Sequence, residues 1–271
     1  MPVITLTTEW KQDDIYSGII KGKLSSLSPG TAIIDNAGNI PAFDVAKAAF
    51  IIRNTFENYS EGSVHLICVH SEAAKNQDYL IVKAKKHFFI GADNGIFNLI
   101  LNYDHDEVNS APYEVIKISG QEALNEIDIF SKTAVALIAG KDTSELGEPA
   151  AEIKKMMPLR ATIDKDTIIG SVIFTDSYGN AISNITRKVF LRVFDNREFS
   201  IVIQSNRNYT DHISKKYSDA PVGEMLAKFN RLDLLEVAIN GSNISKLLSI
   251  EVGSAVRIEA ANKPAEPNKL F

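Results

Sequence analysis

A strand-to-helix junction near the start of the chain reads Thr8-Glu9-Trp10-Lys11-Gln12-Asp13-Asp14-Ile15-Tyr16-Ser17-Gly18. It follows a β-rich run at residues 3–7, so three carboxylates stand where an expected first strand ends and a helix begins. Open α/β sheets bind ligands at the carboxyl ends of their strands. The junction therefore predicts an α/β fold with a ligand site at this edge. Glu9 is a candidate anchor for a sugar diol, whereas Asp13 or Asp14 fits the role of a helix cap equally well.

Outward from the junction, short β-rich runs alternate with helical stripes up to about residue 157. The pattern predicts strands at residues 3–7, 31–35, 64–69, 79–82, 88–90 and 113–118, and core-facing helices at residues 43–56 and 124–140. After Met157-Pro158 the helical period nearly disappears, and we expect strands at residues 168–175, 189–193, 199–203 and 254–258. These patterns predict an α/β domain over residues 1–157 and a mostly β domain over residues 158–271.

Composition narrows the function classes. The formal net charge of -5 and the pI near 5.6 argue against a nucleic-acid partner, which would require a basic surface. The single cysteine, Cys68, excludes an intramolecular disulfide and lies in an apolar run that suits a buried thiol. The first residues lack a signal-peptide pattern, and no run approaches the ~18 apolar residues of a membrane span. We therefore expect a cytoplasmic protein with no membrane partner.

Common cofactor motifs are missing from the sequence. Gly140-Lys141-Asp142-Thr143 has Val135 where a P-loop needs its first glycine, and no G-x-G-x-x-G follows the first strand. The five histidines are not at metal-binding spacing, and His65 and His70, an odd number apart, are expected on opposite faces of one strand. We predict no metal and no bound cofactor.

Three further segments offer ligand-binding groups at turns. They read Ile40-Pro41-Ala42-Phe43-Asp44, Gly91-Ala92-Asp93-Asn94-Gly95 and Asp176-Ser177-Tyr178-Gly179-Asn180. Each alone is more typical of an ordinary turn. Together they supply a stacking ring, amide hydrogen bonds and a carboxylate for an ammonium group, which is what an adenosyl amino acid requires.

The order of these segments resembles the family of S-adenosylmethionine hydrolases (adenosine-forming), also called SAM hydroxide adenosyltransferases, and the related fluorinases and chlorinases. The resemblance covers nearly the whole chain. Besides the segments above it includes Ile33-Ile34-Asp35, Gly62-Ser63-Val64-His65, Asp128-Ile129-Phe130, Leu146-Gly147, Asn184-Ile185, Tyr217-Ser218-Asp219, Gly223 and residues 235–241, Leu-Glu-Val-Ala-Ile-Asn-Gly. It implies a Rossmann-like amino-terminal domain, a carboxyl-terminal β-barrel domain and a homotrimer. It also implies a pocket between the first domain of one subunit and the second domain of the next.

The resemblance also implies roles for individual residues. Glu9 would hold the ribose, and it is longer than the family's usual Asp. Phe43 would line the adenosyl pocket, Asp176 would meet the methionine ammonium, Tyr178 would pack on adenine, and Asn180 would hydrogen-bond the adenine edge. Three more positions are expected to bind the ligand, namely Asp14, Arg231 and Gly241.

The chain departs from the hydrolase pattern at the water site. An Asp, an Arg and a His normally orient and activate the attacking water, and the aligned positions here are His70, Gln77 and Asn125. The glycine-rich run after that Asp is replaced by Ser71-Glu72-Ala73-Ala74-Lys75, and the Ser-Ser-Gly loop that grips the amino acid becomes Arg231-Leu232-Asp233. The sequence thus resembles a divergent member of this family, one that lacks the usual triad.

Our leading hypothesis is an enzyme that hydrolyses S-adenosylmethionine to adenosine and L-methionine by water attack at C5′. His70 would accept the water proton while Asn125 or Glu126 orients the water. Two alternatives remain: a non-catalytic adenosyl-ligand binder or sensor, and an enzyme for another 5′-substituted adenosine, suggested by Arg231. Halogenation is the least favoured reaction, because Glu72 and Glu126 would repel a halide if they faced the pocket.

Overall fold

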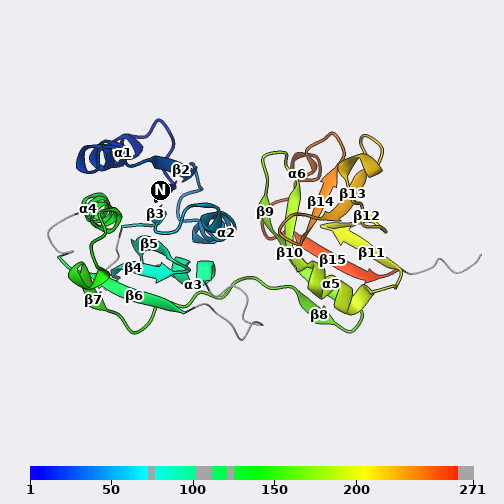
Figure 1. Cartoon of the computed structure of the whole chain (residues 1–271). Coiled ribbons are helices and arrows are strands. Elements are labelled where there is room, and N and C mark those ends of the chain that lie inside the picture. The colour runs from blue at the N-terminus through cyan, green and yellow to red at the C-terminus, as the bar shows by residue number, and fades with distance from the viewer. Residues whose placement is uncertain (73–76, 102–111, 121–124, 262–271) are drawn as a thin grey trace, which may run out of the picture. The chain divides into compact units, whose positions relative to one another are not determined.

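The structure, a computed structural model, describes residues 1–72, 77–101, 112–120 and 125–261. Two sequence predictions fall partly outside these ranges: residues 73–75 of the replaced glycine-rich run, and the start of the second expected helix at Leu124. The chain divides into two compact units, Met1–Pro158 and Leu159–Phe271, each of which is described by itself (Figure 1).

Unit 1 is built on one sheet with the strand order β2-β1-β3-β5-β4-β6-β7. The strands are β1 (Ile4–Thr8), β2 (Ile33–Ala37), β3 (Val64–Cys68), β4 (Tyr79–Ala84), β5 (His87–Ala92), β6 (Tyr113–Ile118) and β7 (Gly147–Pro149). The helices are α1 (Ile15–Leu27), α2 (Val45–Thr55), α3 (Ile96–Leu101) and α4 (Glu126–Ile138), with short 3-10 turns at Phe56–Asn58 and Thr143–Glu145.

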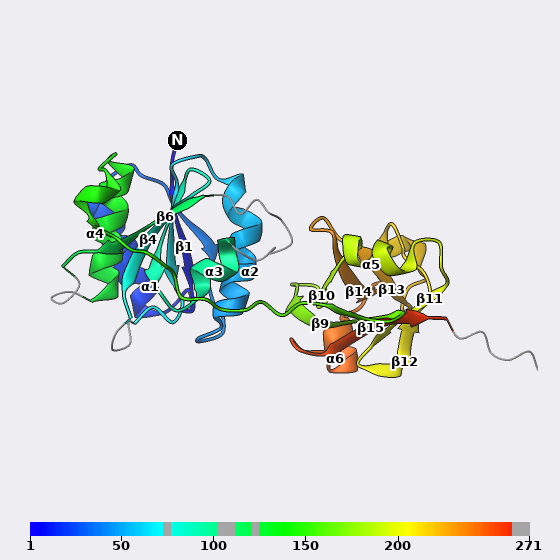
Figure 2. The same cartoon turned by 90° about the horizontal axis from the view of Figure 1, so that it is seen from below.

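Both faces of this sheet are covered by helices. Successive side chains on a strand point to opposite faces, so Leu66 and Cys68 of β3 join the core against α1 and α4, while Ile67 joins the core against α2 and α3. Figure 2 shows the sheet between these two helix pairs. The result is a three-layer α/β unit, as the alternating pattern predicts.

The sheet is mixed, which corrects the simple crossover pattern of a Rossmann-like domain. Strands β2, β1, β3 and β5 are parallel, whereas β4, β6 and β7 pair antiparallel. A two-residue turn at Lys85 and Lys86 joins β4 to β5, and both residues have positive φ, 47° and 64°. Such a turn usually contains Asn or Gly, so its lysines gave no hairpin signal in the sequence.

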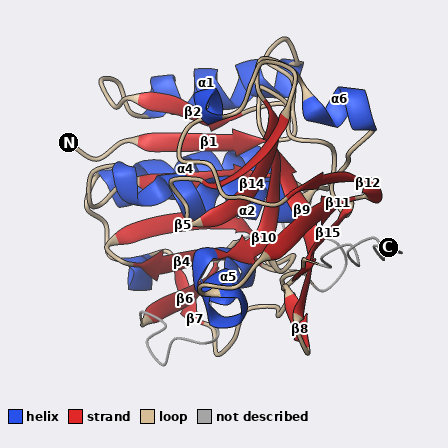
Figure 3. Ribbon diagram, turned by 90° about the vertical axis from the view of Figure 1, so that its right-hand side faces the viewer, coloured by secondary structure: helices blue, strands red, loops and turns tan. Residues whose placement is uncertain are grey.

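Unit 2 is an all-antiparallel, nearly closed, barrel-like sheet in the order β12-β11-β15-β9-β10-β14-β13 (Figure 3). Its end strands, β12 and β13, lie near each other (Figure 1). Its strands are β8 (Thr162–Asp164), β9 (Thr167–Thr175), β10 (Ala181–Thr186), β11 (Phe199–Ile203), β12 (Ser205–Thr210), β13 (Met225–Phe229), β14 (Leu234–Ile239) and β15 (Ala255–Ala260). Helices α5 (Arg187–Phe194) and α6 (Ile244–Leu248) and a 3-10 turn at Tyr217–Asp219 complete it. In neither unit does a described helix have the length and apolar character needed to cross a bilayer.

The strand expected at residues 189–193 is wrong, because this segment belongs to helix α5. The Thr186 hydroxyl accepts a hydrogen bond from Val189 N at 3.1 Å and caps the helix. Phe190 and Phe194, four residues apart, are both buried on one face. The cap and this spacing outweigh the β preference of the two valines.

Candidate functional site

Three segments of unit 1 meet at the carboxyl end of β1. Glu9 N donates to Cys68 O at 3.0 Å, which extends the pairing of β1 with β3. Ile40 N donates to Thr8 O at 3.2 Å, and Glu9 Oε2 accepts from Phe43 N at 2.7 Å. Glu9 is therefore held by the loop that carries Phe43, and one of its carboxylate oxygens already has a backbone partner.

Phe43 and His70 face each other across this edge. Their ring centroids lie 5.2 Å apart in an edge-to-face arrangement. Both residues have a positive backbone φ, 65° for Phe43 and 47° for His70. These values lie in the left-handed region, which residues other than glycine rarely adopt. Phe43 is 68% exposed, so a large apolar ring is open to a ligand. Strain of this kind in two touching residues favours a functional role.

His70 lies beyond the strand on which the sequence placed it. Strand β3 ends at Cys68, whereas His65 is buried near the other end of the same strand. The buried side chain of Asn94 holds the segment, since its Nδ2 donates to Val69 O and His70 O, each at 3.1 Å. Asn94 Oδ1 also accepts from Ile96 N at the start of α3. Sequence reasoning marked the turn at residues 91–95 but not this supporting role.

Asn125 stands at the amino terminus of α4 and caps it. Its Oδ1 accepts a hydrogen bond from Asp128 N at 2.9 Å. The next residue, Glu126, lies within electrostatic reach of Cys68 at the end of β3: burial chiefly raises the pKa of the Cys68 thiol, and the charges of Glu126 and Glu9 raise it further. The helix terminus with Asn125 thus belongs to the same edge of the sheet, and Cys68 is a protonated, buried thiol.

Asp14 takes the capping role that the sequence left open. Its side chain accepts from Tyr16 N at 3.1 Å at the start of α1. The Tyr16 ring packs against the indole of Trp10, with centroids 5.6 Å apart. These contacts fix the path of the junction between β1 and α1.

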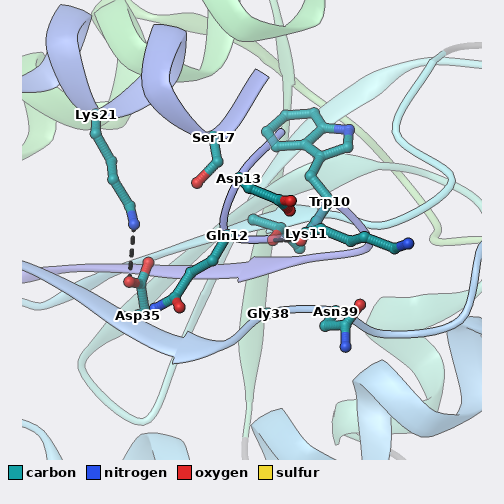
Figure 4. Close-up of a pocket in the computed structure, with 10 residues that line it drawn as sticks. Trp10, Lys11, Gln12, Asp13, Ser17, Lys21, Asp35, Gly38 and Asn39 are labelled. Carbon is teal, nitrogen blue, oxygen red and sulfur yellow. Dashed lines mark hydrogen bonds and ion pairs between the residues drawn. The ribbon is translucent and has the colours of Figure 1, made fainter. Parts of the chain in front are cut away.

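A cavity of about 550 Å³ lies at this junction, between α1 and β2 (Figure 4). Its floor includes Lys21 and Asp35, whose charged groups pair at 2.8 Å. The remaining lining residues are Thr8, Trp10, Lys11, Gln12, Asp13, Ser17, Gly38 and Asn39. Glu9 bonds instead to Phe43 N, and none of Glu9, Phe43 and His70 lines this cavity.

In unit 2 the predicted residues of the 176–180 segment form one hairpin between β9 and β10. Asp176 Oδ1 accepts from Tyr178 N and Asn180 N, both at 2.9 Å, and Oδ2 accepts from Asn180 Nδ2 at 3.0 Å. Tyr178 is 79% exposed, whereas Asn180 is only 5% exposed. The carboxylate of Asp176 therefore shapes the hairpin, and the exposed ring of Tyr178 stands at its tip.

The start of α6 packs closely against this hairpin. Gly179 has a φ of 85°, and a Cβ there would lie 2.1 Å from the side chain of Asn243. Ser245 Oγ also donates to Gly179 O at 2.8 Å. The two other predicted positions, Arg231 and Gly241, are exposed in turns after β13 and β14. The Arg231 side chain forms no hydrogen bond or ion pair with another described residue.

The unit 1 cluster combines three complementary groups. Glu9 offers a carboxylate oxygen, Phe43 offers an exposed ring face, and His70 offers an imidazole that is open to solvent. A carboxylate accepts hydrogen bonds from a diol, an aromatic ring packs on a base or sugar, and a neutral imidazole accepts a proton. The arrangement suits the binding of a nucleoside with a reacting carbon near a proton acceptor.

Comparisons with known proteins cover most of the chain. The family model described as SAM hydroxide adenosyltransferase N-terminal domain matches residues 4–147, and the corresponding C-terminal domain model matches residues 170–257. A Thermus thermophilus protein named (R)-S-adenosyl-L-methionine hydrolase is 23% identical over 95% of this chain and 100% of its own length. A Methanocaldococcus jannaschii protein of the same name is 21% identical over 95% and 96%.

Solved structures share the fold. A crystal structure of an uncharacterized conserved protein from Thermotoga maritima superposes with a TM-score of 0.81 at 22% identity, covering 94% of this chain and 99% of that chain. A conserved hypothetical protein from Thermus thermophilus gives a TM-score of 0.74, also at 22% identity, over 95% and 100%. The two family models together span well over half of the residues, and the chain therefore belongs to the SAM hydroxide adenosyltransferase family.

Proposed function

We propose that this protein binds S-adenosylmethionine and hydrolyses it to adenosine and L-methionine by attack of water at C5′. The observation that carries the proposal is the convergence of Glu9, Phe43 and His70 at the carboxyl end of β1 and β3. Family membership and the printed names of the relatives from Thermus and Methanocaldococcus support it. In this proposal the reaction uses only S-adenosylmethionine and water, with no bound cofactor.

The reaction needs no general acid, because the leaving group does not have to be protonated. A lone pair of the water oxygen forms the O–C5′ bond as the C5′–S bond breaks, and that bond's electron pair stays on sulfur. Methionine leaves as a neutral thioether, so only the water must lose a proton. In our proposal a ring nitrogen of His70 takes this proton, while Glu9 holds the ribose hydroxyls and Asn125 or Glu126 orients the water. Holding water and C5′ in line supplies much of the rate.

The test is incubation of purified protein with S-adenosylmethionine, followed by chromatography for adenosine and methionine. The proposal expects the two products in equal amounts, and it expects their loss in His70→Ala. His212→Ala is the matched control, because His212 is an exposed histidine of unit 2 whose side chain contacts only its close neighbours Thr210 and Asp211 among the described residues. It should keep wild-type turnover.

One result would contradict the proposed activity, and another would contradict the role of His70. Binding of S-adenosylmethionine without any product would identify a binder that has lost the chemistry. Full turnover by His70→Ala would remove His70 from the mechanism and leave the carboxylates as the remaining proton acceptors of this edge.

A further inference from the structure

A chain of hydrogen bonds runs from the 176–180 hairpin into the barrel of unit 2. Asn180 Nδ2 donates to Asp176 Oδ2 at 3.0 Å and to Tyr217 Oη at 3.4 Å. Tyr217 Oη in turn donates to Glu236 Oε1 at 2.5 Å. The four residues come from β9–β10, the 3-10 turn at 217–219 and β14, so distant segments are joined by one polar path.

Glu236 is an unusual residue for its place. It lies inside β14, is 4% exposed and is paired across the sheet with Ile182 and Lys228. Burying a carboxylate is costly unless hydrogen bonds compensate for lost water. The Tyr217 hydroxyl supplies such a bond, and Lys228 Nζ lies 4.3 Å from the centre of the Tyr217 ring.

The direction of each hydrogen bond follows from the chemistry of the groups. An ionised carboxylate only accepts, so the NH2 side of the Asn180 amide must face Asp176, and the Tyr217 hydroxyl must give its proton to Glu236. Tyr217 keeps this proton, because burial and then the neighbouring Glu236 raise the pKa of its phenol. The Tyr217 oxygen is therefore an acceptor toward Asn180, and both amide hydrogens of Asn180 are used.

The remaining amide atom of Asn180 is an acceptor. Its Oδ1 has no donor among the residues that the structure describes. A flip of the amide would bring Oδ1 against the Asp176 carboxylate, which is unfavourable. Asn180 can thus offer a ligand an oxygen but no hydrogen.

We propose that Tyr217 and Glu236 are positioning residues that lock Asn180 as a hydrogen-bond acceptor and thereby select a 6-aminopurine over a 6-oxopurine. The 6-amino group of adenine donates to such an oxygen, whereas the 6-oxo group of hypoxanthine presents a second acceptor. This inference rests on the proposed function, since it assumes that the adenine edge reaches Asn180.

The experiment compares the dissociation constants of adenosine and inosine by calorimetry for the whole protein and its variants. The wild type should prefer adenosine by about tenfold, the factor that one net hydrogen bond supplies. Tyr217→Phe frees one amide hydrogen of Asn180 while keeping the ring beneath Lys228, so the ratio should fall toward one as adenosine weakens and inosine gains. Glu236→Gln, whose amide can donate to Tyr217, should act in the same direction. Matched controls are Tyr209→Phe and Glu251→Gln, both at exposed positions, which should keep the wild-type ratio.

The outcomes separate this inference from the proposed function. Equal weakening of both nucleosides in Tyr217→Phe, or an unchanged ratio in Tyr217→Phe and Glu236→Gln, would overturn the positioning role while the adenosyl site stands. If the wild type binds neither S-adenosylmethionine nor adenosine, the proposed function fails and the inference fails with it. Tyr217 is 39% exposed, so Tyr217→Phe should fold even if Glu236→Gln does not.

Discussion

At the scale of single residues, the site depends on side chains that carry backbone strain. His70 has a φ of 47°, and its carbonyl is held by Asn94. An L-residue with a β-carbon pays about 1 kcal/mol for this conformation, whereas glycine does not. A histidine retained at such a position is better explained by a use for its imidazole than by folding.

We therefore predict that two substitutions of this residue differ in stability but not in activity. His70→Gly should be more stable than His70→Ala by about 1 kcal/mol, because only glycine relieves the positive φ. Both variants should lose hydrolysis of S-adenosylmethionine. Urea unfolding and product chromatography measure the two effects, and normal turnover by His70→Gly would show that the ring has no part in the reaction.

Glu9 allows its two roles to be separated. Glu9→Ala removes both the bond to Phe43 N and the charge, and adenosine binding should weaken by ~1.5 to 3 kcal/mol. Glu9→Gln keeps an oxygen for Phe43 N but loses the charge, so we expect a smaller loss of affinity. Calorimetric titration with adenosine checks both variants. Unchanged binding in Glu9→Ala would place the ribose elsewhere.

At the scale of elements, strands β3 and β5 begin with a buried histidine pair that lies apart from the candidate site. His65 Nδ1 bonds Thr5 Oγ1 at 2.8 Å, and its Nε2 bonds His87 Nδ1 at 3.1 Å. The aromatic rings of Phe56, Tyr59 and Phe89 pack around His65. Burial first, and then the nearby His87, lowers the pKa of His65 to about 3.

This pair predicts an acid-sensitive fold. An unfolded histidine titrates near 6.5, so between that pH and about 3 the unfolded state binds a proton that folded His65 does not. The free energy of unfolding should be constant with respect to this group above pH 6.5 and should fall as the pH drops through the window, by at most about 1.4 kcal/mol per pH unit. Thermal or urea unfolding at pH 7 and pH 5 measures the slope. His65→Gln should flatten it, and an equal slope in the variant would assign the acid sensitivity to other groups.

Element types were predictable wherever one period dominated the sequence. Strand β6 and strand β11 begin and end at the residues expected, and α2 lies within its expected stripe. Two features escaped because their signals are weak in sequence. Helix α5 depends on a Thr186 cap and on two phenylalanines that only tertiary packing buries together. The antiparallel placement of β4 depends on a turn made of two lysines.

The candidate site is likewise divided into residues that the sequence predicts and residues that it does not. Glu9, Phe43 and His70 could be chosen from the sequence, since loops after parallel strands meet at one sheet edge. The supporting groups could not, because Asn94 and Glu236 act through contacts across 24 and 19 positions of chain and carry no local pattern. Asp176 was expected to meet an ammonium group, and the structure records its three hydrogen bonds within the hairpin. Its ligand role stays a prediction.

At the scale of the whole molecule, the residues predicted for the ligand are divided between two units. Glu9, Phe43 and His70 belong to unit 1, and Asp176, Tyr178 and Asn180 belong to unit 2, each unit having its own core. The family resemblance implies a homotrimer whose site joins unit 1 of one subunit to unit 2 of the next. We predict a trimeric mass in light scattering of the purified protein.

Such shared sites predict complementation between two defective variants. Glu9→Ala damages only the unit 1 half of a site, and Asn180→Ala damages only the unit 2 half. In a randomly mixed trimer, a site is intact when an Asn180→Ala subunit supplies unit 1 and a Glu9→Ala subunit supplies unit 2, which occurs for about a quarter of all sites. Co-expression with two affinity tags should therefore restore about a quarter of wild-type hydrolysis. The double variant Glu9→Ala/Asn180→Ala, mixed with itself, is the control and should stay inactive. If the mixed trimers are as inactive as either parent while wild-type trimers are active, the two halves of each site come from the same subunit.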